Sequence, residues 1–204
     1  MGDGQRFRGQ IFGCGTTSGT RIVLGHWWES PFGAFADVMV EDVAGHRTLI
    51  APPRIAAFVS TTYRFDEVVE APVSVRADTG RRTGGHIEAE AGPLRLRAAV
   101  GRRTALGWVL RLVPPRLATS SRFALLTDPV ARLLLDGVRT RGSAGSGRSE
   151  TYGATDVRAV TSVRATWDGR DLGALADVDP PVRFGFGSTP RRPSLTQVVT
   201  TVRG

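Results

Sequence analysis

Two carboxylates, Asp37 and Glu41, stand four residues apart in the segment Phe35–Glu41, with Met39 between them. Apolar and polar residues alternate in this segment, which predicts a strand with both carboxylates on the same face. The strand rise separates their Cα atoms by about 13 Å, too far for two carboxyls that share one proton. On an enclosed face the pair is placed to bind a cation or act on a substrate, and on an open face it serves solubility.

The other residue types that could take part in catalysis or metal binding lack a diagnostic spacing. His26, His46 and His86 show no local metal-ligand pattern, so we expect no metal. The chain has no Gly-x-Ser-x-Gly elbow and no lysine, which excludes a lysine Schiff base, pyridoxal phosphate attachment and a P-loop lysine. We expect no cofactor. An enzyme would need Asp37, Glu41, His26 or Asp156 to converge in one pocket, and the sequence favours a protein that is not an enzyme.

Positive charge is concentrated in the middle of the chain. All 27 basic residues are arginine, and the formal net charge is +8. Residues 76–150 hold 14 arginines against 6 acids, a net +8, whereas residues 1–75 and 151–204 carry −2 and +2. The segment 91–127 contains seven arginines and no acid. A solvated face, an anionic ligand or partner, and an anionic membrane surface all fit it. Nucleic acid does not, because Trp108 is the only aromatic residue there before Phe123.

The membrane alternative depends on the segment Thr104–Val113. It predicts a short helix on which Trp108 and Leu110 would insert into a bilayer. The arginines that would meet anionic head groups are Arg102, Arg103, Arg111 and Arg116. The competing interpretation is a helix buried in the core. Gly107 weakens either helix by about 1 kcal/mol relative to alanine.

Alternation with a period of two dominates the rest of the chain. The strongest example is Leu94–Val100, where Leu94, Leu96, Ala98 and Val100 share one face and Arg95 and Arg97 the other. Further strands are predicted at 21–24, 35–41, 46–50, 68–76, 86–90, 151–160, 161–167 and 195–202. Helices are predicted at 54–63 after two prolines, at 104–113, and after Asp128-Pro129 up to Gly137.

Many strands and few helices predict a mainly β protein, a β-barrel or strongly curved antiparallel sheet with two or three short helices, with α+β as the alternative. No linker divides the chain, so we expect residues 1–204 to form a single β-rich domain. The N-terminus lacks the apolar region of a secretory signal, which predicts a cytoplasmic protein. Cys14 is the only cysteine, so no internal disulfide can form.

Two resemblances are visible. Gly25-His26-Trp27 resembles the short Gly-x-Trp element at the start of lipocalin-type barrels, which is compatible with a ligand-binding barrel. The alternative is that Trp27 or Trp28 closes one end of the core. The runs Ser30–Glu41 and Pro180–Phe186 resemble segments of an uncharacterised family of actinobacterial proteins, and the absence of Lys and Asn agrees with such a source. That second resemblance implies no activity and no catalytic residue.

The leading hypothesis is a binding protein whose β-barrel cavity holds a small apolar or amphipathic anionic molecule. Aromatic residues would supply the wall, Arg95 or Arg97 would meet a carboxylate or phosphate at the mouth, and other polar groups would orient the ligand. The candidate ligand-binding residues are Trp27, Trp28, Asp37, Glu41, Tyr63, Arg95, Arg97, Trp108, Tyr152 and Asp156. The glycine-rich stretch 142–148 is either a hairpin loop or an anion-binding loop. The sequence leaves the oligomeric state open.

Overall fold

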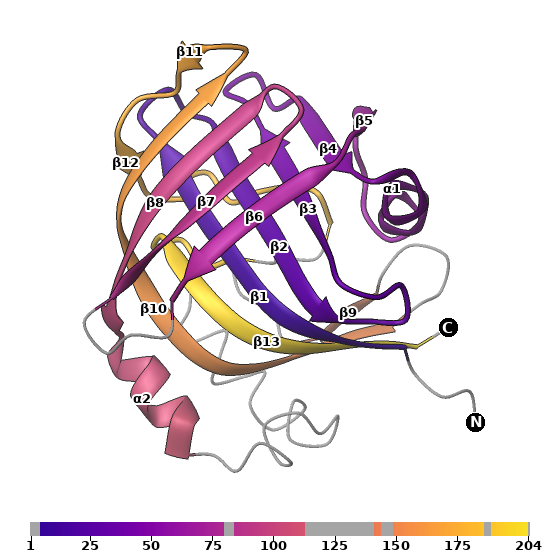
Figure 1. The fold of residues 1–204 in the computed structure, drawn as a ribbon, viewed down its shortest axis with the longest axis vertical. Helices are drawn as coiled ribbons and strands as arrows, with labels where there is room; N and C mark the ends of the chain where they lie inside the picture. The colour runs from indigo at the N-terminus through magenta and orange to yellow at the C-terminus, as the bar shows by residue number, and fades with distance from the viewer. Residues whose placement is uncertain (1–4, 80–83, 113–140, 144–148, 186–188, 204) are drawn as a thin grey trace.

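The computed structural model describes residues 5–79, 84–112, 141–143, 149–185 and 189–203, and this part of the chain is mainly β (Figure 1). It forms a 13-stranded sheet with two short helices, α1 (Pro53–Ser60) and α2 (Ala105–Leu112), outside the sheet. The strands are β1 (Gln5–Thr16), β2 (Arg21–Glu29), β3 (Phe35–Glu41), β4 (Arg47–Ala51), β5 (Glu67–Glu70), β6 (Val73–Asp78), β7 (Gly85–Ala91), β8 (Leu94–Arg103), β9 (Arg141–Ser143), β10 (Ser149–Trp167), β11 (Arg170–Asp171), β12 (Leu175–Ala176) and β13 (Ser194–Arg203). The expected fold class is confirmed.

The sheet is strongly curled into a half-barrel. Its main path runs β5-β4-β3-β2-β1-β13-β10-β8-β7-β6, and β9, β11 and β12 add short pairings to its sides. The curl brings β6 back towards β3, although no hydrogen-bonded ladder joins these two strands in the described residues. In Figure 1, β6, β7 and β8 cross in front of β1, β2 and β3. The enclosed side of the sheet is therefore an interior, and the other side is an outer face.

One pairing departs from the expected antiparallel sheet. β4 and β5 are parallel, with Thr48 opposite Glu67, and α1 connects them. Parallel neighbours need a crossover connection, which the predicted helix at 54–63 supplies. The predicted strand at 68–76 is consequently two strands, which stand at the two ends of the strand order, β5 beside β4 and β6 beside β7.

Apolar residues fill both sides of the sheet. The interior cluster takes alternate residues from strands all around the curl, including Leu24, Val38, Leu94, Leu96 and Val163. The outer cluster lies on the N-terminal strands and β13 and is covered by α1 and by Phe184 of the segment 177–185. A half-barrel with one covered outer face thus offers two places for a binding site, the interior and the space beneath α1.

Local predictions agree with the structure at most elements. The helices predicted at 54–63 and 104–113 are α1 and α2, and the hairpin around Ala44-Gly45 joins β3 to β4. The turn at Trp167–Arg170 joins β10 to β11, with Asp168 and Gly169 both at positive φ. The third predicted helix, after Asp128-Pro129, lies outside the described residues, as does most of the stretch 142–148.

Candidate ligand-binding site

The two faces of β3 separate apolar from ionisable residues. Asp37, Met39 and Glu41 share one face, as predicted, but this is the outer face beneath α1 and the segment 177–185. Val38 and Val40 point into the interior. The two carboxylates therefore do not line the interior, and they do not lie on an open face either, because both are buried. A strand pattern fixes which residues share a face, and the elements that pack on the sheet decide which face is inside.

Three of the candidate ligand residues meet on the outer face in one aromatic pocket. The Trp27 indole Nε1 donates a hydrogen bond of 3.0 Å to Oδ1 of buried Asp37, and Tyr63 lines the same pocket. Phe7 sits at its centre, 6.0 Å from the Trp27 ring in an edge contact and stacked on Phe58 at 5.6 Å. The enclosed volume is about 50 Å³. That space suits a few water molecules, whereas small-molecule ligands occupy about 300 Å³ or more.

The glycine of the Gly25-His26-Trp27 element has a steric role in this pocket. A Cβ on Gly25 would lie 2.5 Å from Oδ1 of Asp37 and 2.6 Å from Nε1 of Trp27. The hydrogen bond between the indole and the carboxylate occupies the space of the missing side chain. The spacing of Gly25 and Trp27 is thus explained by packing between adjacent strands.

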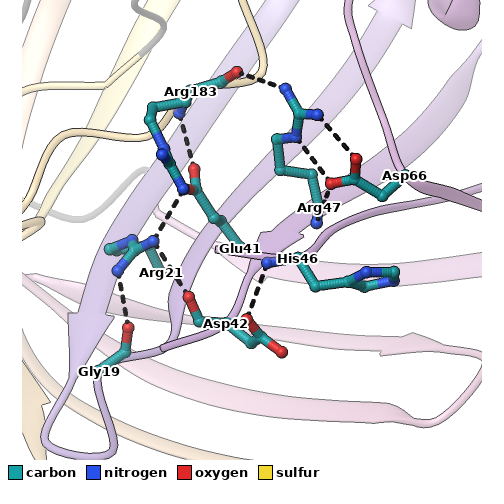
Figure 2. A network of polar contacts seen from close by, with 8 residues as sticks. All are labelled: Gly19, Arg21, Glu41, Asp42, His46, Arg47, Asp66 and Arg183. Carbon is teal, nitrogen blue, oxygen red and sulfur yellow. Dashed lines mark hydrogen bonds and ion pairs between the residues drawn. The ribbon is translucent and has the colours of Figure 1, made fainter. Parts of the chain in front are cut away.

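Glu41 belongs to a buried ionic network (Figure 2). Its side chain is fully buried, forms an ion pair of 3.0 Å with Arg21 and accepts hydrogen bonds from the backbone N (2.7 Å) and Nε (2.8 Å) of Arg183. Arg21 also donates to the backbone oxygens of Gly19 and Asp42. These contacts fix the segment 177–185 and the turn after β3 to the sheet. Glu41 therefore has a structural role, because its carboxylate oxygens are already paired with Arg21 and Arg183.

The adjacent pair of Arg47 and Asp66 extends the network along β4. Arg47 donates from its backbone N and Nε to Oδ2 of Asp66, and from a terminal nitrogen to Oδ1, over 2.8–2.9 Å. These hydrogen bonds hold the pKa of the Asp66 carboxyl well below its usual range. The pair ties the start of β4 to the residue that precedes β5, and so positions Glu67 beside Thr48.

A second, larger cavity opens at the end of the interior where the β1–β2, β3–β4 and β10–β11 turns lie. We call it the end cavity, and its enclosed volume is about 290 Å³. Its apolar surface comes from Val40, Trp167 and Leu172. Polar side chains complete the lining, namely Thr20, Asp42, His46, Thr48, Glu67 and Arg170. It combines an apolar floor with hydrogen-bonding groups, as small-molecule sites do.

Hydrogen bonds join several polar residues at the rim of the end cavity. The Asp42 carboxylate accepts a hydrogen bond of 2.9 Å from the backbone N of His46 across the turn. His46 and Thr48 both reach Oε2 of Glu67, each at 3.4 Å. The lining therefore includes two acidic residues, Asp42 and Glu67, and one arginine, Arg170. This balance favours a neutral or cationic polar group on a ligand over an anionic one.

The two arginines expected at the mouth of a cavity lie elsewhere. Arg95 and Arg97 are on the outer face of β8, where they pair with Glu90 and Glu88 of β7 at 3.7 and 3.1 Å. Neither lines the end cavity or the aromatic pocket. Carboxylates of the neighbouring strand β7 therefore neutralise part of the positive charge of the acid-free segment 91–127.

Asp156 and Trp108 meet on a third side of the molecule, at α2. Arg103 donates from Nε and from a terminal nitrogen to the two oxygens of Asp156, over 2.6 and 2.8 Å, and its guanidinium carbon lies 4.7 Å from the centre of the Trp108 ring. Trp108 is exposed. Both residues are remote from the end cavity, whose lining includes neither. The Tyr152 side chain lies outside the described part of the structure.

The residues considered for acid–base work do not converge. His26 lies on the opposite face of β2 from Trp27 and its partner Asp37, in an edge contact of 6.4 Å with half-exposed Trp28. Asp156 is engaged by Arg103 at α2. Within the described residues no group of three or more His, Cys, Asp or Glu side chains could hold a metal ion.

His26 makes the stability of the protein depend on pH. Burial lowers the pKa of His26 below its ordinary value near 6.5, and its Nδ1 lies 3.2 Å from the amide nitrogen of Gln10. Because the folded state binds this proton less readily than the unfolded chain, stability is lost as pH falls below about 6.5. We expect His26→Gln to remove part of the stability difference between about pH 7.5 and about pH 5.5 in urea denaturation. An unchanged pH difference in the variant would contradict this assignment.

Cys14 is fully buried in the interior cluster. Burial raises the pKa of its thiol to about 12, so the thiol stays protonated and unreactive at neutral pH. Neither helix in the described residues is long and apolar enough to cross a membrane.

None of the residues that line the end cavity was among the sequence candidates. Val40, Thr48 and Leu172 belong to ordinary strand patterns, and Asp42 and His46 to a turn. The sequence signal that could have indicated this site is the clustering of polar residues in turns at the ends of strands. In a curled sheet, several of these turns lie together at one end of the interior. Without the strand order, no pattern shows that the turns after β1, β3 and β10 are neighbours.

Fold and site together define a curled half-barrel β protein with a cavity at one end of its interior and a helix-covered outer face. No family model, no curated protein and no solved structure matches the chain.

Proposed function

We propose that this protein binds a small amphipathic molecule in the end cavity. The observation that carries the proposal is the volume of about 290 Å³ at the end of a curled sheet whose remaining interior is filled with apolar side chains. That volume is at the lower bound for small-molecule sites, about 300 Å³. The aromatic pocket is a less suitable site because it encloses about 50 Å³.

The lining supports a ligand with one apolar and one polar end. Val40, Trp167 and Leu172 offer an apolar contact surface on the interior side. Asp42 and Glu67 offer acceptors at the rim, and Arg170 offers donors. A compact apolar group carrying an amine, amide or hydroxyl fits this lining, because its donors would meet the carboxylates and its apolar part would be removed from water. A ligand with a carboxylate or phosphate would instead be repelled by the carboxylates of Asp42 and Glu67.

The test uses N-phenyl-1-naphthylamine, a neutral amphipathic amine that fluoresces when it leaves water. We expect saturable binding to the wild-type protein, with energy transfer from Trp167 that Trp167→Phe reduces. Leu172→Trp places a larger side chain in the end cavity and is expected to weaken binding at least about tenfold, because the added ring takes up the volume that the ligand would occupy. Val43→Trp adds the same ring at an exposed position outside the lining and serves as the matched control.

The outcomes separate the end cavity from other binding surfaces. Saturable binding that Leu172→Trp weakens and Val43→Trp leaves unchanged supports the proposal. No saturable binding by the wild-type protein, or equal binding by the two variants, overturns it. Thermal unfolding of both variants confirms that each is folded, and Thr48→Val removes one polar lining group without added volume if Leu172→Trp does not fold.

A further inference from the structure

The solvent-facing side of α2 is apolar, the reverse of an ordinary surface helix. Gly107 is the buried residue of this helix and faces the backbone of β10 at Val157. On the opposite side Trp108, Val109 and Leu112 are 60%, 58% and 84% exposed, and Ala105 is exposed beside them. Three large exposed apolar side chains within five residues form a continuous patch, which marks an interaction surface.

Several contacts at its N-terminal end hold α2 in this orientation. The hydroxyl of Thr104 accepts a hydrogen bond of 3.0 Å from the backbone N of Gly107 and donates one of 3.1 Å to the backbone oxygen of Val157. The backbone N of Thr104 donates to the same oxygen at 3.0 Å. Arg103 joins buried Asp156 to the Trp108 ring. The apolar patch is therefore presented outward by contacts on the opposite side of the helix.

The surroundings of the patch are basic. Arg102 comes shortly before the helix and Arg111 lies on it next to Leu112, and both are exposed. The carboxylate in contact with this region, Asp156, is buried and engaged by Arg103. A surface that joins exposed Trp and Leu to exposed arginines matches an interface with an apolar interior and anionic head groups.

We propose that α2 docks the protein on an anionic lipid bilayer. The helix lies along the surface, with Trp108 and Leu112 in the boundary between head groups and acyl chains and with Arg102 and Arg111 among the anionic head groups. A second copy of the chain is a poorer occupant, because a symmetric contact would bring the same arginines together without a carboxylate between them. Figure 1 shows α2 projecting from the sheet at the end away from β11.

The first measurement is co-sedimentation of the whole protein with two kinds of vesicle, phosphatidylcholine alone and phosphatidylcholine mixed with phosphatidylglycerol. We expect strong partition onto the phosphatidylglycerol vesicles and weak partition onto the neutral ones, with the difference reduced by added salt. A blue shift of tryptophan emission should accompany binding and be reduced in Trp108→Phe. Arg111→Gln should weaken partition onto the anionic vesicles about fivefold.

The second measurement compares two substitutions of exposed aliphatic residues. Leu112→Ser removes an apolar side chain from the patch and is expected to weaken partition about tenfold. Val43→Ser removes a 76% exposed valine from the turn between β3 and β4 and is the matched control, expected to bind as the wild type does. Both positions are so exposed that the substitutions leave folding intact.

Three results would overturn the proposal. They are equal partition onto neutral and anionic vesicles, no partition onto either, and partition that Leu112→Ser leaves unchanged. Sedimentation velocity in the absence of lipid tests the alternative occupant, because a dimer that Leu112→Ser dissociates would assign the patch to a second copy. The end cavity plays no part in these measurements, so their outcome is independent of ligand binding.

Discussion

Replacing Glu41 by glutamine is expected to lower the free energy of unfolding by about 3–5 kcal/mol. The Glu41 carboxylate is fully buried between Arg21, itself only 4% exposed, and Arg183. Glutamine keeps the shape but removes the negative charge and turns one acceptor into a donor that faces arginine donors. The cost is large because Arg21 is left as a buried cation without its carboxylate. Urea denaturation at neutral pH measures the loss.

The matched control is Glu88→Gln, which removes a carboxylate paired with Arg97 on the outer side of β7 and β8, where the two side chains are 34% and 71% exposed. Surface pairs contribute about 0–1 kcal/mol, so this variant should unfold close to the wild type. Arg183→Ala should lie between the two, because it removes a mostly exposed guanidinium while Arg21 remains to pair with Glu41. A loss in Glu41→Gln no larger than in Glu88→Gln would show that the network does not hold the fold together.

Strands with an alternating pattern were predictable because the pattern records one buried and one exposed face. Leu94, Leu96, Ala98 and Val100 are all buried in the interior, as the sequence predicts. The alternation survives there because one side of β8 packs inside the curl and the other side meets water. Local signals also identified α1 and α2, because two prolines precede the first apolar run and Pro114-Pro115 follow the second in the sequence.

The central strand β1 was not predicted, and its glycines are the reason. Gly9, Gly13 and Gly15 interrupt the apolar alternation and are typical of loops. In the structure they are sites of close approach: a Cβ on Gly13 would meet the side chain of Thr189, and one on Gly15 the backbone of Asp177. Strands tolerate glycine where another chain segment passes close to the backbone. These two contacts join residues 176 and 162 positions apart, and no local pattern records them.

The two pockets likewise differ in how far the sequence predicted them. Trp27, Asp37 and Tyr63 were selected as polar or aromatic groups near apolar strands, and they do meet, in the aromatic pocket. The end cavity instead depends on strand order, on the parallel pairing of β4 with β5 and on the curl of the sheet. These features are set by long-range packing, so their lining residues carry no signature in the sequence.

Gly107→Ala is expected to destabilise the protein by about 2 kcal/mol, although alanine is the better helix former by about 1 kcal/mol. A Cβ at this position would overlap the backbone oxygen of Val157 and lie 2.9 Å from its nitrogen and 2.6 Å from Cγ of Arg103. β10 cannot retreat, because β8 and β13 pair with it on both sides. The helix must therefore move outward, which weakens the hydrogen bonds between Thr104 and Val157.

Whether Gly107→Ala lowers or raises the free energy of unfolding is the decisive observation. Val109→Ala is the comparison on the same helix. Val109 is 58% exposed, so the change to alanine adds no contact and should raise stability by about 0.5 kcal/mol through helix propensity alone. Opposite signs for the two substitutions, measured by urea denaturation, mean that contact with β10 holds α2 in place. If Gly107→Ala also raises stability, α2 is not seated against β10, and the outward orientation of Trp108 loses its physical basis.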